Sequence, residues 1–133
     1  MDYLPIFLDV KGKKCLVIGG GEVSLRKTSL LVQAGALVTI VSPELNPALT
    51  GLAGTTHIAE RYKSSHLDDH ILVIAATDEE ETNSAVSKDA KQRNIPVNVV
   101  DRDIALFGIL GNRDIGFLLV SSRDDQNVII QVG

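Results

Sequence analysis

The sequence predicts an α/β fold of the Rossmann-like, doubly wound kind, with a mostly parallel sheet. Short apolar runs typical of buried strands alternate with segments of helical periodicity, and the connections between them are short. Three consecutive glycines, Gly19–Gly21, stand between the first such run and the first helical segment. The chain has 133 residues, 44% of them hydrophobic, which favours one globular domain of ordinary size, about 100–150 residues.

The first predicted unit is a strand, a turn and a helix. The apolar run Lys14–Ile18 predicts a buried strand that ends in the three glycines. Residues 22–34 have apolar positions at helical spacing, and Gly35 is suited to cap this helix. The β-branched run over residues 36–41 predicts the next strand, which completes a βαβ unit.

The rest of the predicted sheet follows the same alternation. Asn46-Pro47 predicts a brief helix with a capping asparagine and a proline in its first turn. A polar helix or turn is expected over residues 64–69, and a capping-box pattern over residues 77–80 predicts a helix to about Arg93. Strand-like composition marks three segments in this part of the chain: residues 55–59, 71–76 and 96–100.

The end of the chain has a different pattern. Residues 117–122 and 127–132 look like strands, but no long helix separates them. We therefore expect them to form an antiparallel finish to the sheet.

Composition excludes several classes of function. The 13 basic and 17 acidic residues give a net charge of −4, which argues against a nucleic-acid partner. The apolar runs are far shorter than the roughly 20 residues of a membrane helix, so no membrane partner is expected. A single cysteine, Cys15, is expected to be a buried, inert thiol and suits a reducing, cytoplasmic location.

The glycine turn carries the main chemical signal. Gly19, Gly21 and Ser24 occupy the three positions of the G-x-G-x-x-small fingerprint of dinucleotide-binding folds. The first glycine permits a tight turn, the second lets the backbone approach a pyrophosphate, and the third position needs a small side chain. We interpret the turn as a dinucleotide site, with a purely structural tight turn as the alternative.

The cofactor type depends on the end of the second strand, where the ribose-binding acid is usually found. This place holds Ser42-Pro43-Glu44, and the sequence shows no neighbouring basic residue that could receive a 2′-phosphate. NAD is therefore favoured over NADP. Arg26 and Lys27, one turn into the first helix, either help to balance phosphate charge or are surface residues.

The predicted strand over residues 96–100 is followed by a candidate catalytic group. With the usual strand order 3-2-1-4-5, Asp101 lies two strands from the glycine turn, or roughly 10 Å away. A carboxylate at that place can act on a proton of a substrate lying against the nicotinamide. The alternative is a capping or turn aspartate. His66 and His70 are spaced for a shared metal, but no further ligand is evident, and we predict no metal site.

Several motifs together resemble one family, over about residues 2–107. They are Leu4–Phe7, Cys15–Gly21, Val23 with Arg26-Lys27, Ala75–Asp78 with Asn83, and Val97–Asp101. The combination is similar to the precorrin-2 dehydrogenase family, which includes the N-terminal domain of siroheme synthase.

The resemblance implies an NAD-dependent oxidation of precorrin-2 to sirohydrochlorin, with ferrochelatase activity in some members. By position, Gly19, Gly20 and Gly21 with Glu22 and Val23 would line the pyrophosphate. Ser42, Thr77 and Asp78 would face the adenosine side of NAD, and Asp101 matches the family's essential aspartate. These residues are read from the motifs as they stand in the sequence.

The resemblance also implies partners and a domain organisation. The tetrapyrrole substrate carries many carboxylates, for which Arg102 and Arg113 are candidate contacts, with surface roles as the alternative. Residues 1–110 would form the NAD-binding domain, and residues 111–133 a divergent, shortened start of the region through which the family forms homodimers. The alternative function is a non-catalytic or truncated NAD-binding regulatory module.

Overall fold

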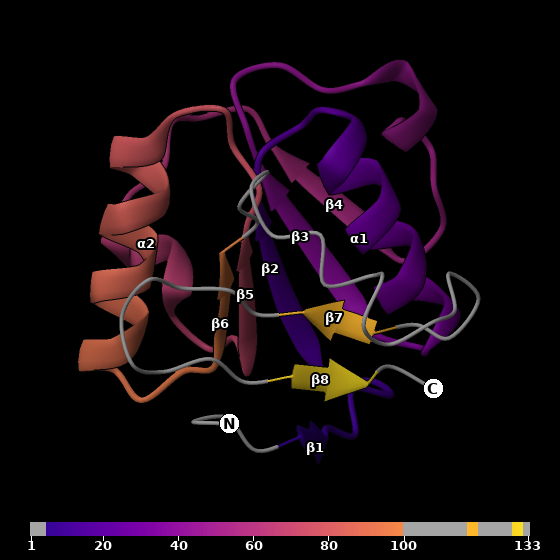
Figure 1. Cartoon of the computed structure of the whole chain (residues 1–133). Helices are drawn as coiled ribbons and strands as arrows, with labels where there is room; N and C mark the ends of the chain where they lie inside the picture. The colour runs from indigo at the N-terminus through magenta and orange to yellow at the C-terminus, as the bar shows by residue number, and fades with distance from the viewer. Residues whose placement is uncertain (1–4, 100–116, 120–128, 132–133) are drawn as a thin grey trace.

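A computed structural model of the chain describes residues 5–99, 117–119 and 129–131. The main sheet consists of five parallel strands: β2 (Lys14–Ile18), β3 (Leu37–Val41), β4 (Thr55–Ile58), β5 (Leu72–Ala75) and β6 (Val97–Val99). Their order in space is β4-β3-β2-β5-β6, which in order along the chain is the predicted 3-2-1-4-5 (Figure 1). The chain therefore runs outward from the central strand β2 through β3 to β4, and then crosses back to β5 on the other side of β2.

The five strands end in one row. Ile18, the last residue of β2, is in register with Val41 of β3 and with Ala75 of β5. The row continues outward to Ile58 at one end and Val99 at the other. The segments that follow the strands thus leave the sheet side by side, along the edge where open α/β sheets bind their ligands.

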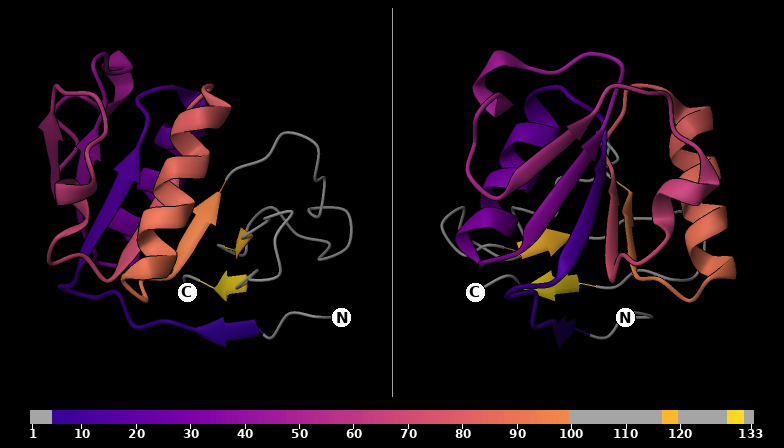
Figure 2. Two further views of the ribbon diagram at one scale, coloured as in Figure 1. Left: turned by 90° about the vertical axis from the view of Figure 1, so that its left-hand side faces the viewer. Right: turned by 180° about the vertical axis from the view of Figure 1, so that it is seen from behind.

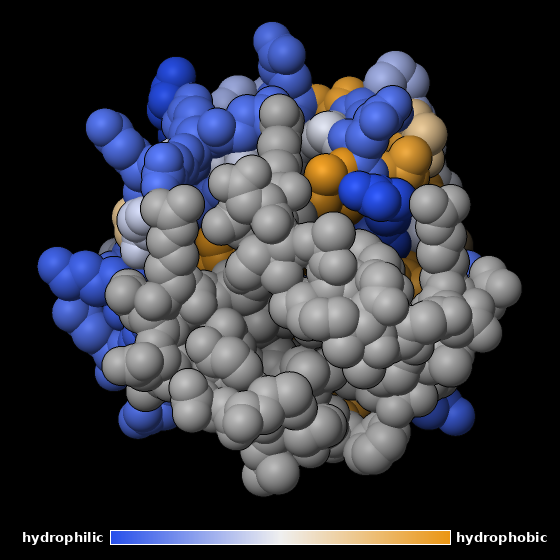
Figure 3. All heavy atoms as spheres, viewed as in Figure 1, coloured by the Kyte–Doolittle hydropathy of each residue, from blue (hydrophilic) through white to orange (hydrophobic). Residues whose placement is uncertain are grey.

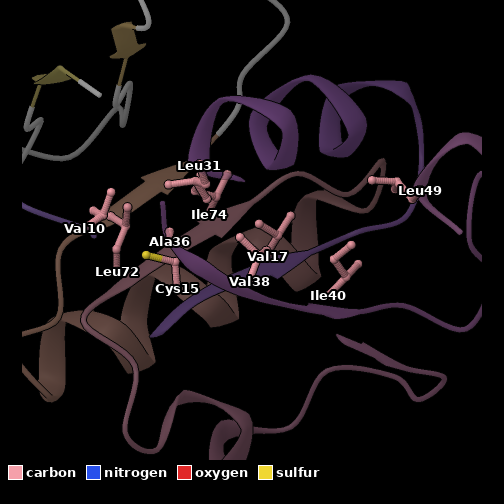
Figure 4. Close-up of a cluster of buried hydrophobic side chains, with 10 residues drawn as sticks. All are labelled: Val10, Cys15, Val17, Leu31, Ala36, Val38, Ile40, Leu49, Leu72 and Ile74. Carbon is pink, nitrogen blue, oxygen red and sulfur yellow. The ribbon is translucent and has the colours of Figure 1, made fainter. Parts of the chain in front are cut away.

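Two α-helices cover opposite faces of this sheet, as the two views of Figure 2 show: α1 (Glu22–Gln33) and α2 (Glu80–Gln92). On one face, Leu31 of α1 packs in a buried cluster with Val17 and Ile74 (Figure 4). On the other face, Val86 of α2 packs with Leu16 and Val73. Adjacent residues of β2 thus belong to different clusters, because side chains of a strand alternate between its faces. The doubly wound α/β fold is confirmed.

Local signals account for the shorter elements. The 3-10 helix η1 (Pro47–Leu49) begins after Asn46, whose side-chain oxygen accepts a hydrogen bond from the Ala48 N–H at 2.9 Å. A second 3-10 helix, η2, covers Ser64–Leu67. The helix α1 is followed by Gly35 with a φ of +85°, the conformation that glycine adopts most readily after a helix. No helix in the part of the chain that the structure describes is long and apolar enough to cross a membrane.

The predicted capping box before α2 is wrong. The helix begins at Glu80, and its N-cap residue, Glu79, makes no side-chain capping bond. Thr77 therefore lies two residues too early to act as the cap. Its hydroxyl instead accepts a bond from the Glu79 N–H at 3.1 Å and shapes the turn between β5 and α2.

The predicted extension of the main sheet by the last two strands is also wrong. The strands β7 (Phe117–Leu119) and β8 (Ile129–Gln131) do pair antiparallel with each other. However, β8 pairs in parallel with β1 (Pro5–Phe7), and the three strands form a separate sheet. The sequence predicts no strand at residues 5–7, because three residues are too few to show an alternating pattern.

Candidate functional site

A cleft of about 1000 Å³ lies along the edge where the main strands end. It is bounded by the glycine turn after β2, by the segment from Ser42 to Pro47 after β3, and by the turn from Ala76 to the start of α2. This edge is uppermost in Figure 1, and Figure 3 shows hydrophilic side chains gathered there over the amino end of α2. Its volume lies at the top of the range of about 300–1,000 Å³ typical of small-molecule sites.

The glycine turn is fixed between the strands on either side of β2. The Gly19 N–H donates to the Val41 carbonyl at 3.0 Å, and the Ala76 N–H donates to the Ile18 carbonyl at 2.8 Å. Gly19 has a φ of +125°, and a Cβ atom there would lie 2.4 Å from the Ala76 carbonyl oxygen. Only glycine fits this position, since the neighbouring atom is backbone and cannot rotate away.

The next two glycines differ in what surrounds them. A Cβ at Gly20 would lie 2.1 Å from the Glu44 carbonyl oxygen, and the Gly20 carbonyl accepts from the Asn46 N–H at 2.7 Å. Gly20 therefore packs the turn against the β3–η1 loop. A Cβ at Gly21 would meet no atom within 4 Å, so the space beside Gly21 is open to the cleft.

Helix α1 begins directly after this open space. Gly21 is its N-cap residue and supplies no side-chain capping bond, so the first N–H groups of α1 have no intrahelical partner. Such N–H groups and the positive end of the helix dipole favour an anion. Ser24, at the third fingerprint position, is fully buried against the sheet, as the fingerprint requires. These residues fit a dinucleotide pyrophosphate.

The wall after β3 is built by Ser42 and its neighbours. Ser42 is buried, and its hydroxyl donates to the Glu44 carbonyl. The Ser42 carbonyl lies 2.8 Å from His57 Nε2. Because a carbonyl only accepts, this nitrogen of His57 carries the proton and donates it, which ties β4 to the end of β3.

The sequence-predicted cofactor residues all lie on this one cleft: Gly19, Gly20, Gly21, Glu22, Val23, Ser42, Thr77 and Asp78. They come from three segments separated by up to about sixty residues along the chain, and the common end of the strands brings them together. Asp101, Arg102 and Arg113 lie outside the described residues. Asp101 follows β6, whose last residue, Val99, is in register with the cleft edge.

Acidic side chains dominate the charge of the cleft: Glu22, Glu44, Glu60, Asp78, Glu79 and Glu81. Among the described lining residues the one cation is Arg61, and its guanidinium lies 3.9 Å from the Glu79 carboxylate. The sequence shows no cation next to Ser42, and the structure adds Arg61 to the lining of the same cleft. Arg61 is far from Ser42 in sequence, and the parallel pairing of β3 with β4 brings its segment to the same edge.

The two basic residues of α1 lie away from the cleft lining. Arg26 is exposed, whereas Lys27 is only 7% exposed. Burial, and to a smaller extent the neighbouring Arg26 charge, together lower the pKa of Lys27 to about 8. Of the two roles considered for Lys27, a surface position is wrong.

Of three buried polar side chains in this part of the molecule, sequence reasoning considered only Ser24, as the small residue of the glycine fingerprint. The hydroxyls of Ser24 and Thr28 and both amide atoms of Asn98 are buried without a hydrogen-bond partner. Asn98 is in register with Ile74 in the sheet, so its side chain is on the α1 face. Buried polar atoms without partners are uncommon. For Asn98 the sequence signal is a polar residue within an apolar strand, whereas Ser24 and Thr28 lie in α1.

Cys15 and the histidines have other roles. Cys15 is fully buried, and burial raises its pKa to about 11, so its thiol is protonated and inert as predicted. His66 accepts from the Lys63 N–H at 2.9 Å and bonds the Glu60 carboxylate at 3.0 Å. In the described ranges there is no group of three or more side chains that could hold a metal ion.

Comparison with known families identifies residues 6–105 as a match to a family described as "Putative NAD(P)-binding". The matched range contains all of the cleft described above. It supports the cofactor predicted from the glycine turn.

Curated relatives share one name. A siroheme synthase of Methylobacillus flagellatus is 53% identical over 104 residues, which are 76% of this chain and 22% of the relative. Siroheme synthase 2 of Aeromonas hydrophila is 44% identical over 136 aligned positions, which cover 99% of this chain and 29% of that protein. The chain thus spans less than a third of the length of these relatives.

Solved structures show the same fold. SirC, a precorrin-2 dehydrogenase, superposes with a TM-score of 0.65 at 24% identity, over 74% of this chain and 52% of SirC. The Escherichia coli tRNA N6-threonylcarbamoyladenosine dehydratase superposes with a TM-score of 0.56 at 14% identity, over 91% of this chain and 74% of the dehydratase.

Proposed function

This chain belongs to the NAD(P)-binding family that its glycine turn and sheet predict, and we propose that it catalyses the NAD-dependent dehydrogenation of precorrin-2 to sirohydrochlorin. The proposal rests on the agreement between the geometry of the cleft and the identity of the relatives. The cleft has the geometry of a dinucleotide site, and relatives at 44–53% identity over the same residues are siroheme synthases. The resemblance of the motifs to precorrin-2 dehydrogenases points to the same reaction.

The charge of the cleft supports NAD as the cofactor. A 2′-phosphate would add negative charge beside Glu44, Glu60 and Glu79, whereas the two hydroxyls of an unphosphorylated ribose can donate to carboxylates. Arg61 is already engaged with Glu79. We therefore expect NADP to bind more weakly than NAD, which competitive titration of the two cofactors measures.

The residues of the chain divide the work between binding and proton transfer. Gly19–Gly21, Glu22 and Val23 hold the pyrophosphate, and Ser42, Thr77 and Asp78 hold the adenosine side. Bound NAD supplies the hydride acceptor. Asp101, which follows the end of β6, takes the proton that leaves the substrate as the hydride departs.

The family resemblance also suggests a domain organisation, a second activity and a cellular location, which we include in the proposal. Residues 1–110 form the NAD-binding domain, and residues 111–133 begin the region that joins two copies as a homodimer. Insertion of ferrous iron into the product is a further activity of the same cleft. The reaction takes place in the cytoplasm, which suits a chain whose one cysteine is a buried thiol.

An anaerobic assay tests the reaction. The purified chain is incubated with precorrin-2 and NAD, and sirohydrochlorin absorption and NADH are followed together. We expect both to rise in the wild type. Clear NAD binding without turnover would refute the dehydrogenase and leave a non-catalytic NAD-binding module.

The role of Asp101 has its own test in the same assay. Asp101→Ala should abolish turnover while NAD affinity stays within about twofold, because the carboxylate acts on the substrate and not on the cofactor. A fully active Asp101→Ala variant would show that another group takes the proton.

A further inference from the structure

We propose that Asn83 is a positioning residue for the cofactor, because its side chain holds the turn that forms one wall of the cleft. Asn83 is on α2, one turn after the helix begins, and is only 8% exposed. It does not line the cleft. The inference rests on the proposed function, since it concerns how the site for NAD is kept in shape.

Three hydrogen bonds join the Asn83 amide to a single residue of the turn, Thr77. The Asn83 Oδ1 atom accepts from the Thr77 backbone N–H at 3.2 Å and from the Thr77 hydroxyl at 2.7 Å. Its Nδ2 atom donates to the Thr77 carbonyl at 3.0 Å. The side chain therefore pairs with the backbone of Thr77 on both sides, as a neighbouring strand would.

These contacts fix which way the amide points. The Thr77 N–H can only donate and the Thr77 carbonyl can only accept, so Oδ1 and Nδ2 of Asn83 have one possible arrangement. No other side chain of similar size supplies an acceptor and a donor at these two places except aspartic acid in its protonated form. Asparagine is thus the side chain that makes all three bonds without taking up a proton.

The contacts also connect β5 to α2 at the cleft edge. Thr77 lies two residues after Ala75, the last residue of β5, and its hydroxyl accepts a hydrogen bond from the Glu79 N–H at 3.1 Å. Asp78, which lines the cleft, lies between these two residues. Thr77 is held on one side of Asp78 and Glu79 on the other, so the backbone of Asp78 has little freedom. The turn of Thr77 and Asp78 therefore presents one conformation to the adenosine side of NAD.

A near-isosteric substitution tests this role. Asn83→Leu keeps the size of the side chain and removes all three hydrogen bonds. We expect the NAD dissociation constant to rise on the order of tenfold or more, since polar groups of Thr77 lose their buried partner. In the turnover assay the KM for NAD should rise while kcat at saturating NAD stays within about twofold, as for a lost uniform binding interaction.

Three further variants separate positioning from stability and charge. Val86→Ala removes buried atoms about one turn further along the same helix, so it should lower the unfolding temperature and leave NAD affinity unchanged. Asn83→Asp keeps two of the three bonds but sets a carboxylate against the Thr77 carbonyl, and should weaken NAD binding less than Asn83→Leu. Ser84→Asp adds the same charge at an exposed neighbouring position and should have little effect.

Hydrogen exchange of the Thr77 amide provides a test without cofactor. In the wild type this N–H is bonded to Asn83 and should be protected, whereas Asn83→Leu should make it exchange at least about tenfold faster. Faster exchange with unchanged NAD affinity would overturn the inference. If the wild type itself fails to bind NAD, the proposed function fails, and the exchange result still decides whether Asn83 holds the turn.

Discussion

Gly19 and Gly21 are two residues apart, yet an added methyl group should damage different properties of the protein. At Gly19 the methyl would lie 2.4 Å from the Ala76 carbonyl oxygen, in a backbone conformation with φ of +125°. At Gly21 it would meet no atom within 4 Å, and the backbone φ of −92° is open to alanine. We therefore expect Gly19→Ala to reduce stability and Gly21→Ala to reduce cofactor binding.

The loss of stability at Gly19 can be worked out from these contacts. Holding a non-glycine residue in such a conformation costs about 1–3 kcal/mol. Moving the end of β5 away breaks the bond between the Ala76 N–H and the Ile18 carbonyl, at about 1 kcal/mol. The free energy of unfolding should fall by about 2–4 kcal/mol. With an unfolding entropy of about 0.28 kcal/mol/K for 133 residues, the Tm should fall by about 7–14 °C.

Gly21→Ala is the matched variant. As an N-cap residue, alanine in place of glycine costs at most about 1 kcal/mol, so the Tm should fall by no more than about 4 °C. The methyl group would occupy the space into which the pyrophosphate must come, and the NAD dissociation constant should rise tenfold or more, about 1.4 kcal/mol. Thermal unfolding by circular dichroism and calorimetric NAD titration measure the two effects. A Gly21→Ala variant that binds NAD like the wild type would refute the reasoning.

Three further properties can be predicted from named residues. Between pH 8 and about 10.5 the unfolded chain binds a proton at Lys27 that the folded chain has lost, so the free energy of unfolding should rise with pH by about 3 kcal/mol. Lys27→Met should remove this rise in urea unfolding at pH 7 and pH 10, and an unchanged slope would assign the rise to other groups. The Cys15 thiol, with its pKa raised to about 11 by burial, should react with a thiol reagent only after unfolding, and rapid labelling of native protein would contradict its burial. Glu44→Gln should lower the ratio of NAD affinity to NADP affinity, because it removes one carboxylate near the ribose end of the cleft. An unchanged ratio of the two affinities would show that Glu44 does not contribute to cofactor selectivity.

The main sheet could be predicted from sequence because its signals are local. The run Lys14–Ile18, the glycine turn and the helical spacing after it each indicate their own structure, and the usual strand order of this fold class is the one observed. The eight predicted cofactor residues reached one cleft for the same reason, because each directly follows a recognisable strand.

The features that sequence analysis missed depend on contacts between distant segments. Arg61 reaches the cleft through the pairing of β3 with β4, and no local sequence pattern near Ser42 predicts that it lies there. The capping box failed because α2 begins at Glu80, which leaves Thr77 free to bond Asn83. The small sheet of β1, β8 and β7 joins opposite ends of the chain through strands of three residues, which carry too little periodicity to identify.

Amide chemical shifts measured during an NAD titration of isotopically labelled protein test the central claim most directly. If the cleft holds the dinucleotide, the largest changes should fall on Gly19–Val23, Ser42 and Thr77-Asp78, with saturation at one NAD per chain. Residues at the opposite end of the sheet, such as Lys14 and Leu37, should hardly change. Changes centred at that opposite end, or none at all at saturating NAD, would contradict the account.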